Sequence, residues 1–214
     1  MPASQIHLVR HGEVFNPDEV LYGRLENFGL SELGHRMANA AADDLVARHR
    51  PISALYTSPL LRARQSGQPI SQAFELAPSI EDRIIEPTNA FEGRRMKGPG
   101  GALRDPRMWR FLWNPWRPAW GEPFRQVSAR MLAAMTDAQA SVDSGDVVMV
   151  SHQLPIWMAH LTIVGKKLPH DPRKRRCALS SITSFEFRDG RFVEVGYVDP
   201  AAPLAVGATD VGAV

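Results

Sequence analysis

Two kinds of apolar pattern alternate along the first part of the chain. Short apolar runs that end at a turn-forming Gly or Ser-Pro predict buried β-strands. Longer segments whose apolar residues recur at helical spacing predict amphipathic helices. The strands are expected at 5–10 and 52–57, and the helices at 31–48 and about 60–74. Ser31 is a suitable N-cap for the first helix, whose inward positions are expected to be Leu33, Met37, Ala41, Leu45 and Val46.

The second half of the chain continues the alternation. Helices are predicted at 123–142 and 154–164, on either side of a buried strand of Val and Met at 146–151. Strands alternating with helices indicate an α/β fold, a three-layer α/β/α sandwich with a mostly parallel central sheet. Near the end, apolar runs at 181–187 and 192–198 flank an Asp-Gly step, which predicts a hairpin that we expect at an edge of the sheet.

A chain of 214 residues is long enough for one well-buried domain and short for two. We place this single domain at 1–199. The segment 200–214 is rich in Ala, Gly and Val without a usable period, so we expect it to be loosely held.

Composition is that of an ordinary soluble protein, with 44% hydrophobic and 22% charged residues. A net charge of +2 does not indicate a nucleic-acid or membrane partner. The N-terminus leads straight into a strand, so we expect neither a signal peptide nor a membrane span. A single cysteine, Cys177, excludes an intrachain disulfide and fits the reducing cytoplasm, where we expect the protein to reside.

Candidate chemistry gathers where the predicted strands end. His11 follows the first strand, His152 follows the strand at 146–151, and Arg62 comes soon after the strand that ends at Thr57. Open α/β sheets bind ligands at the carboxyl ends of their strands. Arginine offers a planar donor fork that pairs with phosphate oxygens, so histidines and arginines converging there suit a phosphate dianion.

Several ordered motifs resemble the histidine phosphatase superfamily, which includes the cofactor-dependent phosphoglycerate mutases. The motifs are Arg10-His11-Gly12, Gly29-Leu30-Ser31-Glu32-Leu33-Gly34, Ser58-Pro59-Leu60-Leu61-Arg62-Ala63-Arg64-Gln65-Ser66, Ile85-Glu86 with Phe91-Glu92-Gly93, and Val150-Ser151-His152. A further segment, Leu179-Ser180-Ser181-Ile182-Thr183, resembles the family's closing strand. The matches occur in the family's order from residue 5 to about 198 and so cover nearly the whole chain. The resemblance implies a phosphoglycerate mutase-like fold, with His11 as the nucleophile that becomes transiently phosphorylated.

The same resemblance assigns the other site residues. Arg10, Arg62 and His152 would surround the phosphate, Asn16 would lie near it, and Glu86 would be the general acid. Physical argument supports these roles, because neighbouring arginines favour the neutral, nucleophilic imidazole and a leaving alkoxide needs a proton. Other carboxylates near the motifs stay open as the acid, namely Glu13, Glu81, Asp82 and Glu92. Arg64 is disfavoured as a phosphate ligand, since it cannot face the same way as Arg62 on a helix.

The expected function is hydrolysis of a phosphomonoester, a small phosphorylated metabolite, through phosphohistidine and without metal or cofactor. One alternative is a mutase that returns the phosphoryl group to its substrate, with a bisphosphorylated sugar acid as cofactor. Another is a non-catalytic protein that binds a phosphorylated ligand. Zinc binding by His7 and His11 is disfavoured, because their spacing brings ligands together on a helix rather than a strand.

Two further segments allow several interpretations. Four tryptophans, Trp109, Trp113, Trp116 and Trp120, fall within 105–121. They could pack onto the domain, form a lid or substrate wall, or make a homodimer contact. The basic run at 173–176 could bind acidic ligands or nucleic acid, but a solvated loop is favoured.

Overall fold

The computed structural model describes residues 2–95 and 121–210, and the Trp-rich segment lies almost entirely outside them. A six-stranded sheet forms the centre, in the order β3-β2-β4-β1-β5-β6. The first four of these strands in spatial order are parallel, and β5 and β6 form an antiparallel hairpin at one edge. The strands are β1 (Gln5–Arg10), β2 (Ile52–Thr57), β3 (Ser79–Ile80), β4 (Asp146–Ser151), β5 (Ile182–Arg188) and β6 (Arg191–Val198).

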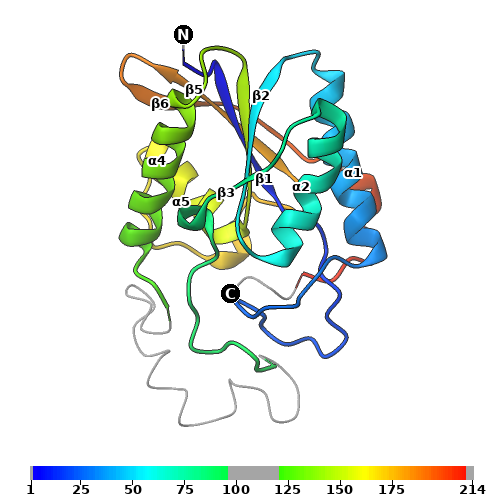
Figure 1. Ribbon diagram of the computed structural model, residues 1–214. Coiled ribbons are helices and arrows are strands. Elements are labelled where there is room, and N and C mark those ends of the chain that lie inside the picture. Colours follow the sequence, from blue (N-terminus) through cyan, green and yellow to red (C-terminus); the bar gives the residue numbers. More distant parts are fainter. Residues whose placement is uncertain (1, 96–120, 211–214) are drawn as a thin grey trace.

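Helices cover both faces of the sheet, which confirms the three-layer α/β/α prediction. The helices α1 (Glu32–Ala47) and α2 (Leu61–Phe74) pack together on one face. The helices α4 (Phe124–Ala140) and α5 (Gln153–Ile163) pack together on the other (Figure 1). Short 3₁₀ turns at Asp82–Ile84, Pro172–Lys174 and Ala202–Leu204 complete the described elements.

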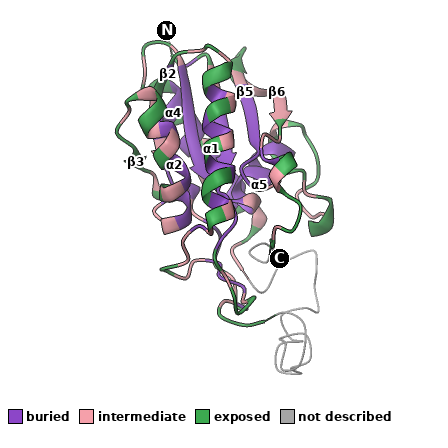
Figure 2. Cartoon of the chain, turned by 90° about the vertical axis from the view of Figure 1, so that its right-hand side faces the viewer, coloured by how far each residue is buried: buried purple, intermediate pink, exposed green. Residues whose placement is uncertain are grey.

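The central strand β4 separates two apolar cores, because its alternate side chains point to opposite faces. Val147 and Met149 pack with α4 and α5, whereas Val148 and Val150 pack with α1 and α2. Burial on both faces explains why β4 reads as an unbroken apolar run. Figure 2 shows the buried strands at the centre and exposed residues on the outer faces of the helices.

Local signals in the sequence place most element ends. The Ser31 hydroxyl accepts a hydrogen bond from the Gly34 amide, which confirms the N-cap of α1. Asp189 and Gly190 have φ angles of 50° and 76°, as a tight hairpin turn requires. One expected inward position is wrong: Val46 is 45% exposed, because it lies beside the buried stripe that ends at Leu45.

A buried polar network lies near the amino ends of β1 and β4, and we define it by His7, Ser184, Asp146, Arg48 and Arg50. His7 Nδ1 lies 2.8 Å from Ser184 Oγ, and His7 Nε2 lies 3.2 Å from Asp146 Oδ2. Arg50 donates twice to Asp146, and Arg48 donates to Ser184. No polar side-chain atom of this network is buried without a partner among the described residues. The network therefore ties β1, β4 and β5 together.

The chain after β6 returns toward α1. Ala201 is buried against Met37 and Leu179, and the backbone amide of Thr209 donates to the Glu13 carboxylate at 2.7 Å. These contacts carry the described end of the chain, at Asp210, to the carboxyl end of β1.

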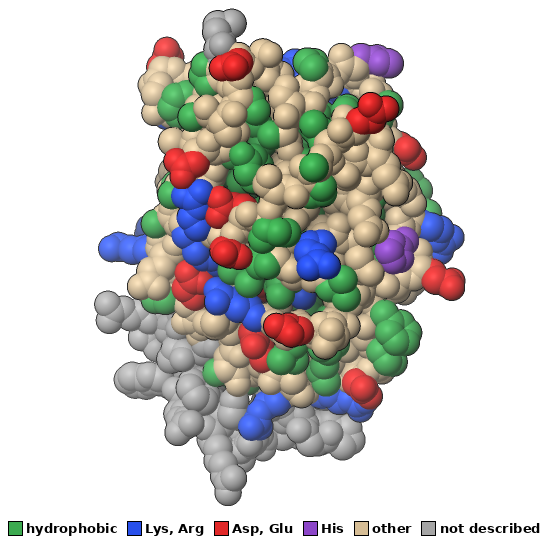
Figure 3. Space-filling view, viewed as in Figure 1, with side chains coloured by type: hydrophobic (Ala, Val, Ile, Leu, Met, Phe, Trp, Pro, Cys, Tyr) green, Lys and Arg blue, Asp and Glu red, His purple; other side chains and the backbone are tan. Residues whose placement is uncertain are grey.

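Charged side chains of both signs are interspersed over the face of the molecule that Figure 3 shows. Arg83 illustrates the pattern, because it pairs with Glu81 at 2.6 Å and with Asp137 at 2.7 Å. Among the helices of 2–95 and 121–210, none combines the length and apolar character that crossing a bilayer requires.

Candidate active site

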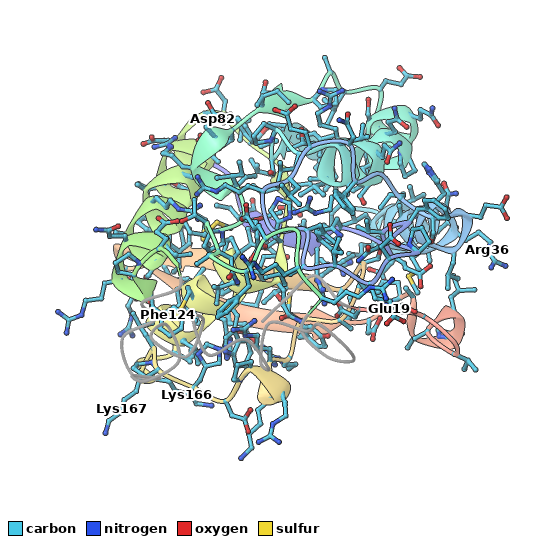
Figure 4. All side chains as sticks on the ribbon, turned by 90° about the horizontal axis from the view of Figure 1, so that it is seen from below. Glu19, Arg36, Asp82, Phe124, Lys166 and Lys167 are labelled. Atoms are coloured by element: carbon cyan, nitrogen blue, oxygen red, sulfur yellow. The ribbon has the colours of Figure 1, made fainter. Side chains whose placement is uncertain are left out.

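The two histidines of the motifs lie side by side because β1 and β4 are parallel neighbours. Arg10 pairs in register with Ser151, so the next residue of each strand, His11 and His152, emerges at the same edge of the sheet. Their ring centroids are 5.2 Å apart. Figure 4 looks onto this end of the molecule, where the labelled Arg36 and Lys167 side chains point outward from the rim.

Glycine is required where the chain leaves β1. A Cβ on Gly12 would lie 2.4 Å from the Gly34 carbonyl oxygen, closer than real contacts allow. The Gly12 amide also donates a hydrogen bond to the Ser66 hydroxyl of α2 at 3.0 Å. The motif glycines thereby hold the His11 loop against the starts of α1 and α2.

His11 is buried and has one ring nitrogen occupied. Its Nδ1 lies 2.8 Å from the Gly12 carbonyl oxygen, which can only accept, so the proton of the neutral ring is on Nδ1. Burial lowers the pKa of His11 well below 6.5, and the charges of Arg62 and Arg10 lower it further. The unprotonated Nε2 therefore carries a lone pair suited to nucleophilic attack.

Two buried arginines beside His11 have N–H groups without a hydrogen-bond acceptor among the described residues. Arg10 and Arg62 are each 1% exposed. Arg62 donates from Nη2 to the Gly23 carbonyl at 2.6 Å and lies over the Tyr22 ring at 4.7 Å. Arg10 Nε, Arg62 Nε and Arg62 Nη1 have no hydrogen-bond partner in the described part of the chain. Buried, charged donors without acceptors mark a site for an anion.

Asp210 already binds one of these arginines. Its two carboxylate oxygens accept from Arg10 Nη2 at 2.6 Å and Arg10 Nη1 at 2.8 Å, and Nη1 also donates to the Cys177 carbonyl at 2.8 Å. This bidentate geometry is the one that Arg forms with carboxylate or phosphate. Asp210 thus takes up N–H groups of the same guanidinium whose Nε is unpartnered.

His152 lies between Ser58 and Glu86. Its Nε2 is 2.7 Å from Ser58 Oγ, and its Nδ1, which has no hydrogen-bond partner among the described residues, is 3.8 Å from Glu86 Oε2. Burial lowers the pKa of His152 well below 6.5, with further lowering by Arg62 and His11. When Ser58 donates to Nε2, the ring proton is on Nδ1 and becomes a donor toward the space between His152 and Glu86.

Glu86 is 8% exposed and follows the 3₁₀ turn at Asp82–Ile84. Burial raises its pKa to about 7, although the charges of Arg62, Arg175 and Arg10 oppose the rise. A substantial fraction of Glu86 is therefore protonated near neutral pH. A carboxyl group in this state can both give and take a proton.

The other carboxylates near the motifs have structural partners. Glu13 accepts from the Ser31 hydroxyl and the Thr209 amide, and Glu92 accepts from the backbone amides of Arg24 and Asn89. Glu81 pairs with Arg83, and Asp82 begins the 3₁₀ turn. The geometry of the site thus favours Glu86 over Glu13, Glu81, Asp82 and Glu92.

Two further sequence candidates have surroundings that do not assign them to phosphate. Both polar atoms of the Asn16 side chain bind the backbone of Val20, at 2.8 and 3.2 Å, so Asn16 shapes its own loop. Its contact with phosphate stays a prediction. Arg64 is exposed, whereas Arg62, two residues earlier in the same helix, is buried in the site.

Tyr22, Ser58 and Asp210 join the site without having been assigned a role from the sequence. Tyr22 is buried 6.4 Å from the His11 ring, and burial raises its pKa to about 12. It lies in a loop without hydrophobic periodicity, and Asp210 lies in the C-terminal segment. Ser58 alone carried a signal, as the first residue of a quoted motif.

A metal site is not evident in the described residues, where no three His, Cys, Asp or Glu side chains cluster. His7 and His11 do not share a ligand site, because His7 is bound to Ser184 and Asp146. The chemistry of the site is that of arginine N–H groups and a neutral histidine.

The comparison with known families agrees with this geometry. The family model of the histidine phosphatase superfamily (branch 1) matches residues 6–200. The chain belongs to this superfamily. It is 49% identical over 200 residues to the uncharacterized protein Rv0525 of Mycobacterium tuberculosis, with 93% of this chain and 98% of that protein covered.

Solved structures share the fold at lower identity. The phosphoserine phosphatase of Entamoeba histolytica, in complex with 3-phosphoglyceric acid, has a TM-score of 0.72 at 22% identity and covers 90% of this chain and 95% of its own. The mycobacterial glucosyl-3-phosphoglycerate phosphatase Rv2419c has a TM-score of 0.74 at 22% identity, with 90% and 97% covered. The superfamily assignment supports a phosphoryl-transfer enzyme.

Proposed function

We propose that the protein hydrolyses phosphomonoesters through a phosphohistidine on His11. The observation that carries the proposal is the set of Arg10 and Arg62 N–H groups that have no acceptor among the described residues. They lie beside a neutral histidine whose proton is on Nδ1, which leaves the Nε2 lone pair for attack. A phosphoryl group would satisfy these donors and bring its phosphorus atom to the nucleophile. The phosphatases with the same fold, named above, are consistent with this activity.

In the first step His11 Nε2 attacks phosphorus, so that a P–N bond forms while the bond to the alcohol oxygen breaks. Arg10 and Arg62 stabilise the charge on the equatorial oxygens, and His152 adds a neutral donor. Protonated Glu86 gives its proton to the leaving oxygen.

In the second step water hydrolyses the phosphohistidine. Glu86, now a carboxylate, takes a proton from the water as its oxygen attacks phosphorus, and the P–N bond breaks to restore His11. Inorganic phosphate and the alcohol are the products, and Glu86 is again protonated.

The direct test is turnover of p-nitrophenyl phosphate by wild type and by His11→Ala, with His35→Ala as the matched control because His35 is exposed on α1. His11→Ala is expected to lose activity by about 10³-fold or more, whereas His35→Ala keeps it. Rapid quenching should trap phosphoenzyme that is stable in base and lost in acid. Equal turnover by wild type and His11→Ala would refute the proposal.

The mutase alternative is tested in the same preparation. A mutase would return the phosphoryl group to substrate and depend on a bisphosphorylated sugar acid, whereas a hydrolase releases inorganic phosphate without it. A protein that only binds phosphorylated ligands would retain them without release of phosphate or formation of phosphoenzyme.

A further inference from the structure

The members of the basic run at 173–176 do not share one environment. Arg173 is exposed and pairs with Asp171 at 3.0 Å. Arg176 pairs with Glu194. The neighbouring lysines Lys166 and Lys167 are exposed and point outward in Figure 4. These cations are balanced by a carboxylate or by water, as a solvated loop requires.

Arg175 differs from them because its side-chain hydrogen-bond acceptors among the described residues are neutral groups. It donates from Nε to His170 Nε2 at 2.9 Å and from Nη1 to Gln153 Oε1 at 3.0 Å. His170 holds its own Nδ1 against the Leu168 carbonyl at 2.6 Å, which leaves Nε2 as the acceptor of a neutral ring. Within 2–95 and 121–210, Arg175 forms no ion pair and no hydrogen bond from Nη2. No carboxylate of the described residues is therefore in contact with this partly buried charge.

Hydrogen bonds connect Arg175 to the candidate active site. Gln153, which accepts from Arg175, directly follows His152 and donates from Nε2 to the Cys177 carbonyl at 3.5 Å. The same carbonyl accepts from Arg10 at 2.8 Å. Arg175 and Arg10 are therefore held by one continuous set of groups at the carboxyl end of the sheet.

The electrostatics place Arg175 on the side of the general acid. Burial lowers the pKa of Arg175 to about 10, and Glu86 is the strongest of the charges that oppose this lowering. In turn, the charge of Arg175 has the second-largest lowering effect on the pKa of Glu86, after that of Arg62. Glu86 gives its proton to the alcohol oxygen in the proposed reaction, so a cation that interacts with Glu86 is suited to act on the alcohol part of the substrate.

We propose that Arg175 binds a second anionic group, a carboxylate or a phosphate, on the alcohol part of the substrate. The inference rests on the proposed function, because the positions of the leaving group and of Glu86 define each other. An arginine fork suits either anion, and a desolvated guanidinium without a counter-ion gains most from one. His170 and Gln153 hold the fork in place before the substrate arrives, which reduces the entropy lost on binding.

The test compares kcat/KM for matched pairs of esters. 3-Phosphoglycerate is paired with glycerol 3-phosphate of the same configuration, which replaces the carboxylate by a hydroxymethyl group. 1,3-Propanediol bisphosphate is paired with the monophosphate. Wild type is expected to prefer the anionic member of at least one pair by about 10- to 100-fold, the effect of one charge-assisted hydrogen-bonded contact. The pair that shows the preference identifies the anion.

Variants of the run assign the preference to one residue. Arg175→Gln is expected to reduce the ratio to below about 3, chiefly by raising KM for the anionic ester, whereas Arg175→Lys keeps part of it. Arg173→Gln is the matched control and keeps the wild-type ratio. Arg175→Lys alone suffices for the test when Arg175→Gln does not fold.

Two outcomes would overturn the inference. One is that wild type turns over the esters with a neutral alcohol part as well as it turns over those with a second anionic group. The other is an equal loss for both members of a pair in the Arg175 variants, which would make Arg175 a structural residue. Absence of turnover with every ester would instead refute the proposed phosphatase function.

Discussion

His7 lies in the strand β1 and His11 directly follows it, and the two histidines belong to polar clusters that differ in hydrogen bonding. At His7, in the buried polar network, the Ser184 hydroxyl donates to Nδ1, the ring donates to Asp146, and Arg48 and Arg50 complete the set. At His11, in the candidate active site, buried arginine N–H groups have no acceptor among the described residues.

The difference shows which cluster serves the fold and which is suited to a ligand. A buried donor without an acceptor costs about 1 to 3 kcal/mol, and more when it is charged, so folding alone does not favour it. The network at His7 avoids this cost by pairing every group. The site at His11 retains it, as expected of a site whose partner is a bound anion.

The largest expected contrast is between two arginines, Arg62 in the site and Arg50 in the network. Arg62→Met is expected to lower kcat/KM for a phosphate ester by about 10³-fold, because it removes donors to the transferred phosphoryl group. Its free energy of unfolding should fall less than that of Arg50→Met, since removal of the unpaired buried N–H groups offsets the loss of the bond to Gly23. Arg50→Met is expected to keep activity and to lower the free energy of unfolding by about 2 kcal/mol, because Asp146 loses two hydrogen bonds.

Steady-state kinetics and urea unfolding of both variants check this contrast. A loss of stability in Arg62→Met as large as that in Arg50→Met would mean that the two clusters do not differ in the way described. So would a loss of activity in Arg50→Met while its unfolding midpoint is unchanged.

A smaller contrast concerns the carboxyl groups of the two clusters, which should give opposite dependences of stability on pH. In the network, burial alone would raise the pKa of Asp146, but the hydrogen bonds from Arg50 and His7 outweigh it and lower the pKa to about 2. The stability contributed by Asp146 is therefore present above about pH 4 and lost as pH falls toward 2. In the site, the pKa of Glu86 is raised to about 7, so stability is highest below about pH 4.5 and declines as pH rises through 7.

Urea unfolding as a function of pH separates the two contributions, each on the order of 2 to 3 kcal/mol. Asp146→Asn should be less stable than wild type at pH 7 and equal to it near pH 2. Glu86→Gln should be more stable than wild type at pH 8 and equal to it near pH 4. A Glu86→Gln variant that is destabilised at pH 8 would show that the ionised carboxylate is well paired, contrary to its assignment as the acid.

Much of the fold follows from local patterns. The two-sided burial of β4 makes an apolar run, the capping of α1 needs only Ser31, and the hairpin turn needs only Asp189-Gly190. These patterns fail for very short elements and at the border of a helix face. The strand β3 has only two residues, too few to show a period, and Val46 is apolar but lies one position outside the buried stripe of α1.

The site was accessible to sequence reasoning only where it lies on regular elements. His11 and His152 follow strands and Arg62 is in the first turn of a helix, so their convergence could be inferred from the topology. The partners of His7 could not be inferred in this way, because Ser184 and Asp146 come from other strands. Arg10 and Asp210 are 200 positions apart, and no local pattern predicts that the C-terminal segment reaches the site.

Asp210 pairs with Arg10 in the site as Asp146 pairs with Arg50 in the network. The smallest predicted effect tests whether the Asp210 carboxylate competes with phosphate for Arg10. A phosphate that binds Arg10 through Nε and Nη2 must displace Asp210 from Nη2. Because Asp210 is exposed, its bond to Arg10 is worth little, about 1 kcal/mol. Asp210→Asn is therefore expected to lower the inhibition constant of inorganic phosphate by about 3- to 5-fold. A raised inhibition constant would instead mean that Asp210 orients Arg10 for phosphate, so that the site, like the network, depends on its carboxylate.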